Sequence, residues 1–152
     1  MILEASALSE LAAGCAQVDS REACGFLLGK SDSSGGKVTA IICSQVPEPV
    51  AGEFEISPSE IRRIRRHSKE RGLEILALFH THPSGNPAMS DSDRNALQHS
   101  EWPWVIVTWS ASENRFTLTG YQTGAGEPFT VRCRRGPSER VNGSSAGSRR
   151  PS

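Results

Sequence analysis

Two histidines, a serine and an aspartate stand close together in this chain, at a spacing that can close on one metal ion. The segment His80-Thr81-His82-Pro83 is followed, after a short loop, by Ser90 and Asp93. Successive side chains of a strand point to opposite faces, so the two histidines of an extended segment face the same way. Two imidazoles and a carboxylate, with a fourth position left to water, are typical of a catalytic zinc site. The pattern predicts a metallohydrolase, with Glu22 as the candidate base.

The length and composition predict one folded domain and a tail. The 152 residues are enough for a single hydrophobic core. From residue 134 onward the chain is rich in Ser, Gly, Pro and Arg and has almost no apolar residues. Such a segment cannot bury enough apolar surface to offset its ordering entropy. We therefore expect a folded domain over residues 1–133 and a disordered basic tail over residues 134–152.

Charge and cysteine content exclude several classes of protein. The formal net charge is +0, which argues against a nucleic-acid partner. The four cysteines form no Cys-x-x-Cys pair, and we interpret Cys24 as a buried apolar residue rather than a redox sensor. The N-terminal residues lack the pattern of a secretion signal, and no apolar stretch is long enough to span a membrane. We expect a cytoplasmic protein without a membrane partner.

Helical and strand patterns alternate along the chain. They predict helices over 5–18, 58–71 and 91–99, and strands over 23–29, 37–44, 54–56, 73–80, 104–109, 115–122 and 128–134. Ser57, Pro58 and Glu60 have the spacing of a capping box with proline at the first helical position. The order predicts a single α/β domain, a mixed β-sheet flanked by helices.

The histidine segment resembles the signature of the JAMM, or MPN-plus, metalloproteases. That signature is a Glu beside an early strand, then His-x-His-Pro, six residues, Ser, two residues and Asp. Residues 80–93 match it at every position, and residues 22–29 and 54–58 look like two further family segments. The resemblance covers about residues 1–133. It implies the layered JAMM/MPN architecture, which is similar to that of cytidine deaminases.

The resemblance also implies a role for each motif residue. His80, His82 and Asp93 would bind one Zn²⁺ per chain. Glu22 would accept the proton of the zinc-bound water and pass it to the leaving amine, and Ser90 would donate a hydrogen bond to the oxyanion. Ser90 and Asp93 also have the Ser-x-x-Asp spacing of a helix capping box. We expect the capping role of Asp93 to give way to metal binding.

The chain most resembles the small stand-alone prokaryotic members of the family, which process ubiquitin-like sulfur-carrier proteins. The implied reaction is cleavage of the amide or isopeptide bond after a C-terminal Gly-Gly. It would trim an extension or release an amino acid such as cysteine. Several small members associate as dimers, so a homodimer is possible.

Three alternative functions remain open. A RadC-like protein associated with DNA repair also contains His-Pro-Ser-Gly, as residues 82–85 do, but usually carries an N-terminal helix-hairpin-helix region that this sequence lacks. A non-catalytic MPN scaffold would bind proteins, but such members typically lose the metal ligands. A zinc deaminase would need a Pro-Cys-x-x-Cys pair, which is absent from the sequence.

Overall fold

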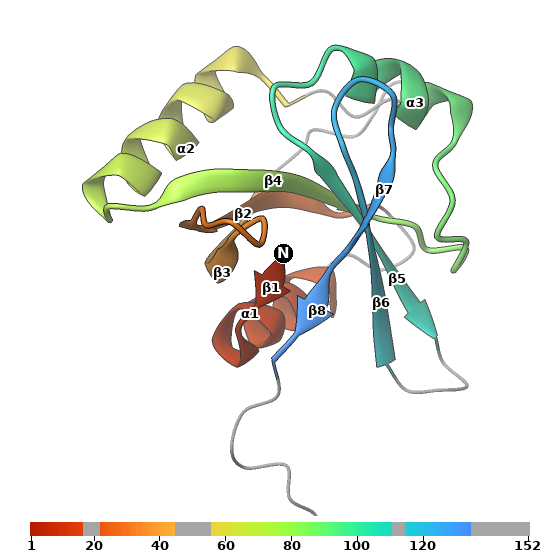
Figure 1. The fold of residues 1–152 in the computed structure, drawn as a ribbon, viewed down its shortest axis with the longest axis horizontal. Helices are drawn as coiled ribbons and strands as arrows, with labels where there is room; N and C mark the ends of the chain where they lie inside the picture. Colours follow the sequence, from red (N-terminus) through yellow and green to blue (C-terminus); the bar gives the residue numbers. More distant parts are fainter. Residues whose placement is uncertain (17–21, 45–55, 111–114, 135–152) are drawn as a thin grey trace, which may run out of the picture.

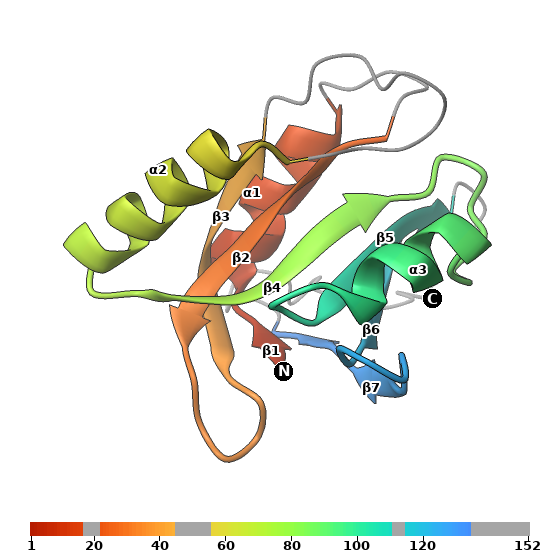
Figure 2. The ribbon, with the colours of Figure 1, turned by 90° about the horizontal axis from the view of Figure 1, so that it is seen from above.

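The computed structural model describes residues 1–16, 22–44, 56–110 and 115–134. The elements in these ranges are β1 (Ile2–Leu3), α1 (Ala5–Ala16), β2 (Cys24–Lys30), β3 (Lys37–Ser44), α2 (Pro58–Glu70), β4 (Glu74–Thr81), α3 (Asp91–Gln98), β5 (Trp104–Ser110), β6 (Arg115–Tyr121), β7 (Pro128–Thr130) and β8 (Arg132–Cys133). Helix α1 lies on one face of the sheet, and α2 and α3 lie on the other (Figures 1 and 2). No helix among the described residues is long and apolar enough to cross a membrane.

All eight strands form one mixed sheet, in the order β7-β6-β5-β4-β2-β3-β1-β8. Strand β2 pairs antiparallel with β3 and β4, whereas β4 pairs parallel with β5. Strand β4 is therefore an interior strand, as its apolar sequence suggests, and it ends at the histidine segment. The predicted α/β class, a mixed sheet flanked by helices, is confirmed.

The prediction of one strand over residues 128–134 is wrong, because Val131 divides it. Strand β7 pairs with β6, while β8 pairs with β1 at the opposite end of the sheet order. The sheet must therefore curl until its two ends meet. Met1 bridges them: its amino group donates to the Thr130 carbonyl at 3.3 Å, and its carbonyl accepts from the Arg132 N–H at 3.0 Å. In Figure 1, β7 and β8 follow one another along the blue end of the chain.

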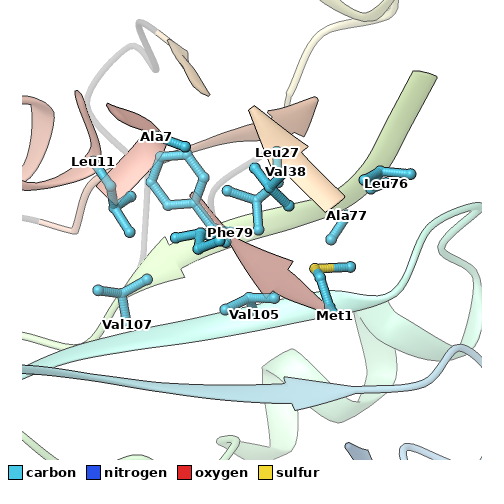
Figure 3. Packing of buried hydrophobic residues seen from close by; sticks show 11 residues of the cluster. Met1, Ala7, Leu11, Leu27, Val38, Leu76, Ala77, Phe79, Val105 and Val107 are labelled. Atoms are coloured by element: carbon cyan, nitrogen blue, oxygen red, sulfur yellow. The ribbon is translucent and has the colours of Figure 1, made fainter. Parts of the chain in front are cut away.

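The main core lies between α1 and the sheet (Figure 3). Its members are fully or almost fully buried: Met1, Leu3, Ala7, Leu11, Leu27, Val38, Leu76, Ala77, Phe79, Val105 and Val107. Two smaller clusters lie on the opposite face, where Ile64 anchors α2 and Leu97 anchors α3. Removing these side chains from water fixes which way each strand faces.

Helix α2 begins as predicted at Ser57, but its capping box is incomplete. The Ser57 hydroxyl accepts from the Glu60 N–H at 3.2 Å, and Pro58 occupies the first turn. The Glu60 carboxylate instead accepts from the Arg63 guanidinium at 2.7 and 2.8 Å and from the Ser44 hydroxyl at 3.2 Å. The Arg63 guanidinium thus takes the place of the Ser57 N–H as a partner of the Glu60 carboxylate.

Some predictions lie partly outside the described residues. Residues 17–18 of the first predicted helix and residues 135–152 of the predicted tail are among these. So are residues 54–55 of the short predicted strand, and Ile56 is described but belongs to no strand.

Candidate metal centre

Strand β4 and the residue that follows it place two imidazoles on the sheet face that α3 covers. His80 is 1% exposed, and its ring lies edge-on to the ring of Trp104, with centroids 5.2 Å apart. Trp104 belongs to the cluster beneath α3, which fixes the face. His82 lies one step beyond the end of β4, and its N–H donates to the Val107 carbonyl at 3.0 Å. The parallel ladder between β4 and β5 thus continues as far as His82 and holds the backbone of both histidines in place.

Asp93, in the first turn of α3, completes a cluster of three possible ligands. Its Oδ1 lies 3.2 Å from His80 Nε2, its Oδ2 lies 3.3 Å from His82 Nε2, and the two Nε2 atoms lie 2.9 Å apart. Zinc–ligand bonds of about 2.0–2.1 Å in a tetrahedron separate ligand atoms by about 3.3 Å. The spacing and the donor types therefore fit Zn²⁺, and these three residues are a group that could hold a metal ion.

The loop after β4 orients the second imidazole. His82 Nδ1 lies 2.8 Å from the carbonyl oxygen of Asn86. A carbonyl only accepts, so the proton is assigned to Nδ1, and the lone pair of Nε2 faces the cluster. Gly85 supports this turn: its φ of +76° is a backbone conformation that favours glycine, and its N–H donates to the His82 carbonyl at 3.0 Å. The loop sequence therefore orients one member of the three-residue group.

Ser90 and Asp93 form a complete capping box at the start of α3. The Ser90 hydroxyl accepts from the Asp93 N–H at 3.1 Å, and Asp93 Oδ2 accepts from both the N–H and the hydroxyl of Ser90 at 2.7 Å. This corrects the expectation that the capping role of Asp93 gives way. A carboxylate has about four lone-pair positions, so it caps the helix and faces the histidines at once.

The environment of Asp93 keeps its carboxylate charged. Burial alone would raise its pKa, but hydrogen bonds from His80 and Ser90, together with the charge of His80, hold the pKa well below its ordinary value. A carboxylate must be deprotonated to bind a metal ion. Asp93 meets this condition throughout the neutral pH range.

The predicted base, Glu22, lies two residues before the neighbouring strand β2 begins at Cys24. Cys24 pairs with His80 in the register of β2 and β4, so two further residues along each chain would bring Glu22 level with His82. Glu22 is exposed and lies outside the three-residue cluster. Cys24 is 2% exposed, and burial, followed by the nearby Cys43, raises the pKa of its thiol to about 12. Cys24 is thus the neutral buried residue that the sequence predicts.

Two contacts of the motif loop were missed by reasoning from the sequence. One is the Asn86 carbonyl, because a backbone acceptor has no sequence signature. The other is Tyr121 of β6, whose hydroxyl donates to the Pro87 carbonyl at 3.0 Å. Nothing in the sequence connects Tyr121 with the loop, because their proximity depends on the order of strands in the sheet.

Comparison with known proteins gives consistent matches. A family model described as prokaryotic homologs of the JAB domain matches residues 4–119. A desampylase of Pyrococcus furiosus is 33% identical over 90 residues, which are 57% of this chain and 59% of that protein. A desampylase of Haloferax volcanii is 27% identical over 112 residues, 74% of this chain and 78% of that protein. The chain thus covers less than two thirds of the Pyrococcus protein.

Solved structures support the fold. A protein from Desulfitobacterium hafniense, known from a solution structure, superposes with a TM-score of 0.74 at 19% identity, covering 92% of this chain and 97% of that one. A JAB1/MPN domain protein from Archaeoglobus fulgidus, known from a crystal structure, gives a TM-score of 0.58 at 17% identity, covering 89% and 100%. At such identities the likeness concerns the fold alone.

Proposed function

The chain belongs to the family of prokaryotic homologues of the JAB domain, and from this premise we propose that it is a zinc-dependent hydrolase of ubiquitin-like proteins. It would cleave the amide or isopeptide bond after the C-terminal Gly-Gly of a ubiquitin-like or sulfur-carrier protein. The products would be the carrier and either a short extension or an amino acid such as cysteine. The two relatives named desampylase support this substrate class. The observation that carries the proposal is the convergence of His80, His82 and Asp93.

The three convergent residues would hold the zinc ion. Zinc supplies a Lewis acid and brings the pKa of a bound water to about 7, so that a nucleophile is available at neutral pH. The side chain of His80 is 1% exposed and that of His82 is 11% exposed. A substrate would therefore approach from the side of His82, and continuation of the register of β2 and β4 would bring Glu22 to the same side.

Glu22 would act first as a general base and then as a general acid. Its carboxylate would accept a proton from the attacking water and deliver that proton to the leaving amine. The oxygen of water forms the new bond to the carbonyl carbon, the C–N bond breaks, and the products are a carboxylate and an amine. The exposed position of Glu22 leaves its carboxylate able to reach a substrate.

Ser90 would stabilise the negative charge that develops on the substrate oxygen. Its hydroxyl donates to Asp93 Oδ2 at 2.7 Å in this structure. A rotation about the Cβ–Oγ bond would leave the oxygen in place and redirect the hydroxyl proton to the substrate. The Ser90 N–H still donates to the same Oδ2, so the cap would survive the exchange. Ser90 would thus work without unwinding α3.

Intact-mass analysis tests the proposal. A ThiS-like or MoaD-like carrier extended beyond its Gly-Gly would be incubated with the zinc-loaded protein, with Glu22→Gln, and with a chelator. Glu70→Gln, at the end of α2, is a control for the loss of an exposed carboxylate. We expect cleavage directly after the second glycine by the wild type and Glu70→Gln alone. Protein that holds one zinc ion and leaves every such carrier intact would refute the proposed substrate class.

A further inference from the structure

Thr81 separates the two histidines of the motif, and its side chain makes a contact that a β-ladder does not require. Its Oγ1 accepts from the Ala23 N–H at 2.7 Å, while its own N–H donates to the Ala23 carbonyl at 2.8 Å. In an antiparallel ladder the first of these bonds normally ends on the carbonyl of the opposite residue. Here a hydroxyl takes the place of that carbonyl, at the point where β4 ends and the chain turns at Pro83.

The residue that Thr81 holds is the immediate neighbour of the proposed base. We propose that Thr81 is a positioning residue that fixes Glu22 beside the metal centre through the Ala23 amide. This inference rests on the proposed role of Glu22. Ala23 is 6% exposed, so its N–H has little access to water as an alternative partner. Without the hydroxyl that amide is left unsatisfied, and the segment that carries Glu22 must shift to satisfy it.

The register of the two strands explains why this bond matters for Glu22. Cys24 and His80 are a non-hydrogen-bonded pair of the antiparallel ladder. The side chains of such a pair lie closer together than those of a hydrogen-bonded pair. Glu22 and His82 would form the next such pair, with the Ala23–Thr81 bonds between the two pairs. Among the described residues, these bonds are the last between the two strands before Glu22.

The residue type suits this role. Threonine is branched at Cβ and has few χ1 rotamers, so its hydroxyl is held in one direction. Strand alternation turns the Thr81 side chain away from the face that carries His80 and His82. Thr81 therefore acts on the centre only through Ala23, and not as a ligand or as a group that touches substrate.

Three substitutions at Thr81 separate positioning from general stability. Thr81→Val keeps the shape of the side chain and removes the hydroxyl acceptor. Thr81→Ala also removes the hydroxyl and adds no methyl group in its place. Thr81→Ser keeps the hydroxyl acceptor. Ser68→Ala is the matched control: Ser68 is buried, and its hydroxyl donates to the Arg65 carbonyl at 3.0 Å in α2. Each zinc-loaded variant would be compared for metal content, melting temperature, kcat and KM on the carrier that the wild type cleaves.

We expect Thr81→Val to keep one zinc ion per chain and a nearly unchanged KM while kcat falls about 10- to 100-fold, the range typical of a misplaced catalytic group. Thr81→Ala should show the same fall in kcat. The inference can therefore be tested with Thr81→Ala even if Thr81→Val does not fold. Thr81→Ser should recover most of kcat, and Ser68→Ala should lower only the melting temperature. Wild-type kcat in both Thr81→Val and Thr81→Ala, or a loss of zinc in proportion to activity, would overturn the inference.

A second readout needs no substrate. Crystal structures of the zinc-loaded wild type and Thr81→Val should show the Glu22 carboxylate beside the metal in the first and displaced in the second, with His80, His82 and Asp93 unchanged. An unmoved Glu22 would overturn the inference whether or not a carrier is cleaved. A displaced Glu22 in a protein whose wild type cleaves no carrier would instead uphold the positioning role and refute only the proposed substrate.

Discussion

Removal of the Asp93 carboxylate should destabilise this protein even when no metal is bound. Oδ2 of Asp93 accepts two hydrogen bonds from Ser90 at 2.7 Å, and these close the N-terminus of α3. The N-cap bond from the N–H of residue 93 to the Ser90 hydroxyl remains in Asp93→Ala, and loss of a hydrogen bond to a charged group costs about 1.5–3 kcal/mol. Because both bonds share one acceptor, we expect Asp93→Ala to lower the free energy of unfolding by about 2 kcal/mol. For a domain of this size the melting temperature should fall by roughly 5–10 °C.

The matched control is Asp91→Ala. Asp91 is also an acidic residue in the first turn of α3, but its side chain is exposed. Both substitutions remove one negative charge near the helix dipole, an effect of about 0.3–1 kcal/mol. The difference between the two variants therefore measures the capping bonds of Asp93 together with its contacts to His80 and His82. Urea unfolding at pH 7 in excess chelator measures it without any contribution from bound zinc.

The effect of pH supplies a further check on the same variant. The pKa of Asp93 is lower in the folded than in the unfolded protein, so its carboxylate stabilises the fold above the unfolded pKa of about 3.9. This contribution is lost as the pH falls through the lower, folded value. The stability gap between wild type and Asp93→Ala should hold from pH 7 to about pH 5 and shrink progressively below about pH 4. Equal stabilities of Asp93→Ala and Asp91→Ala at pH 7 in chelator would show that Asp93 has no capping role.

Three further predictions concern other parts of the molecule. Tyr121→Phe frees the loop that orients His82, so the apparent Kd for zinc should rise about tenfold in a chelator competition, as is typical when support for a ligand is lost. Iodoacetamide at pH 8 should alkylate the exposed Cys133 and spare the buried Cys24, whose pKa is about 12. Mass spectrometry of the folded protein measures the order of alkylation, and alkylation of Cys24 before Cys133 would contradict this prediction. Gly25→Ala should prevent folding, because a Cβ there would lie 2.1 Å from a backbone oxygen of β3. Gly124→Ala, with φ +76° and open space around it, should cost only about 1–2 kcal/mol, so circular dichroism and soluble yield should separate the two.

The group of three candidate ligands could be predicted from the sequence because its geometry is almost entirely local. His80 and His82 share a face through strand alternation, and Ser90 and Asp93 share one helical turn. Only a short loop joins the two pairs, so their spacing along the chain limits how far apart they can lie. The rule that failed was the assumption that Asp93 must choose between capping and facing the histidines, since Oδ1 faces His80 while Oδ2 accepts from Ser90 and also lies near His82.

What could not be predicted depends on contacts between distant segments. Nothing in residues 128–134 indicates that Val131 separates strands at opposite ends of the sheet, because β8 is defined by its pairing with β1. A strand of two residues carries too little pattern to be recognised on its own. The contact between Tyr121 and the motif loop has the same origin. The Thr81 contact was missed for another reason: strand alternation turns its side chain away from the metal, although its hydroxyl bonds to the neighbour of Glu22.

The motif therefore acts as a folding element as well as a chemical one. Ser90 and Asp93 begin α3, and Thr81 closes the ladder between β4 and β2. Each of these contacts joins protein groups only, so folding itself would bear the entropic cost of ordering the proposed ligands, and a metal ion would meet a site that is already assembled. Substitutions in the motif would then change both the stability of the fold and the proposed metal binding. A loss of activity can be assigned to chemistry only when the free energy of unfolding and the zinc content are measured on the same sample.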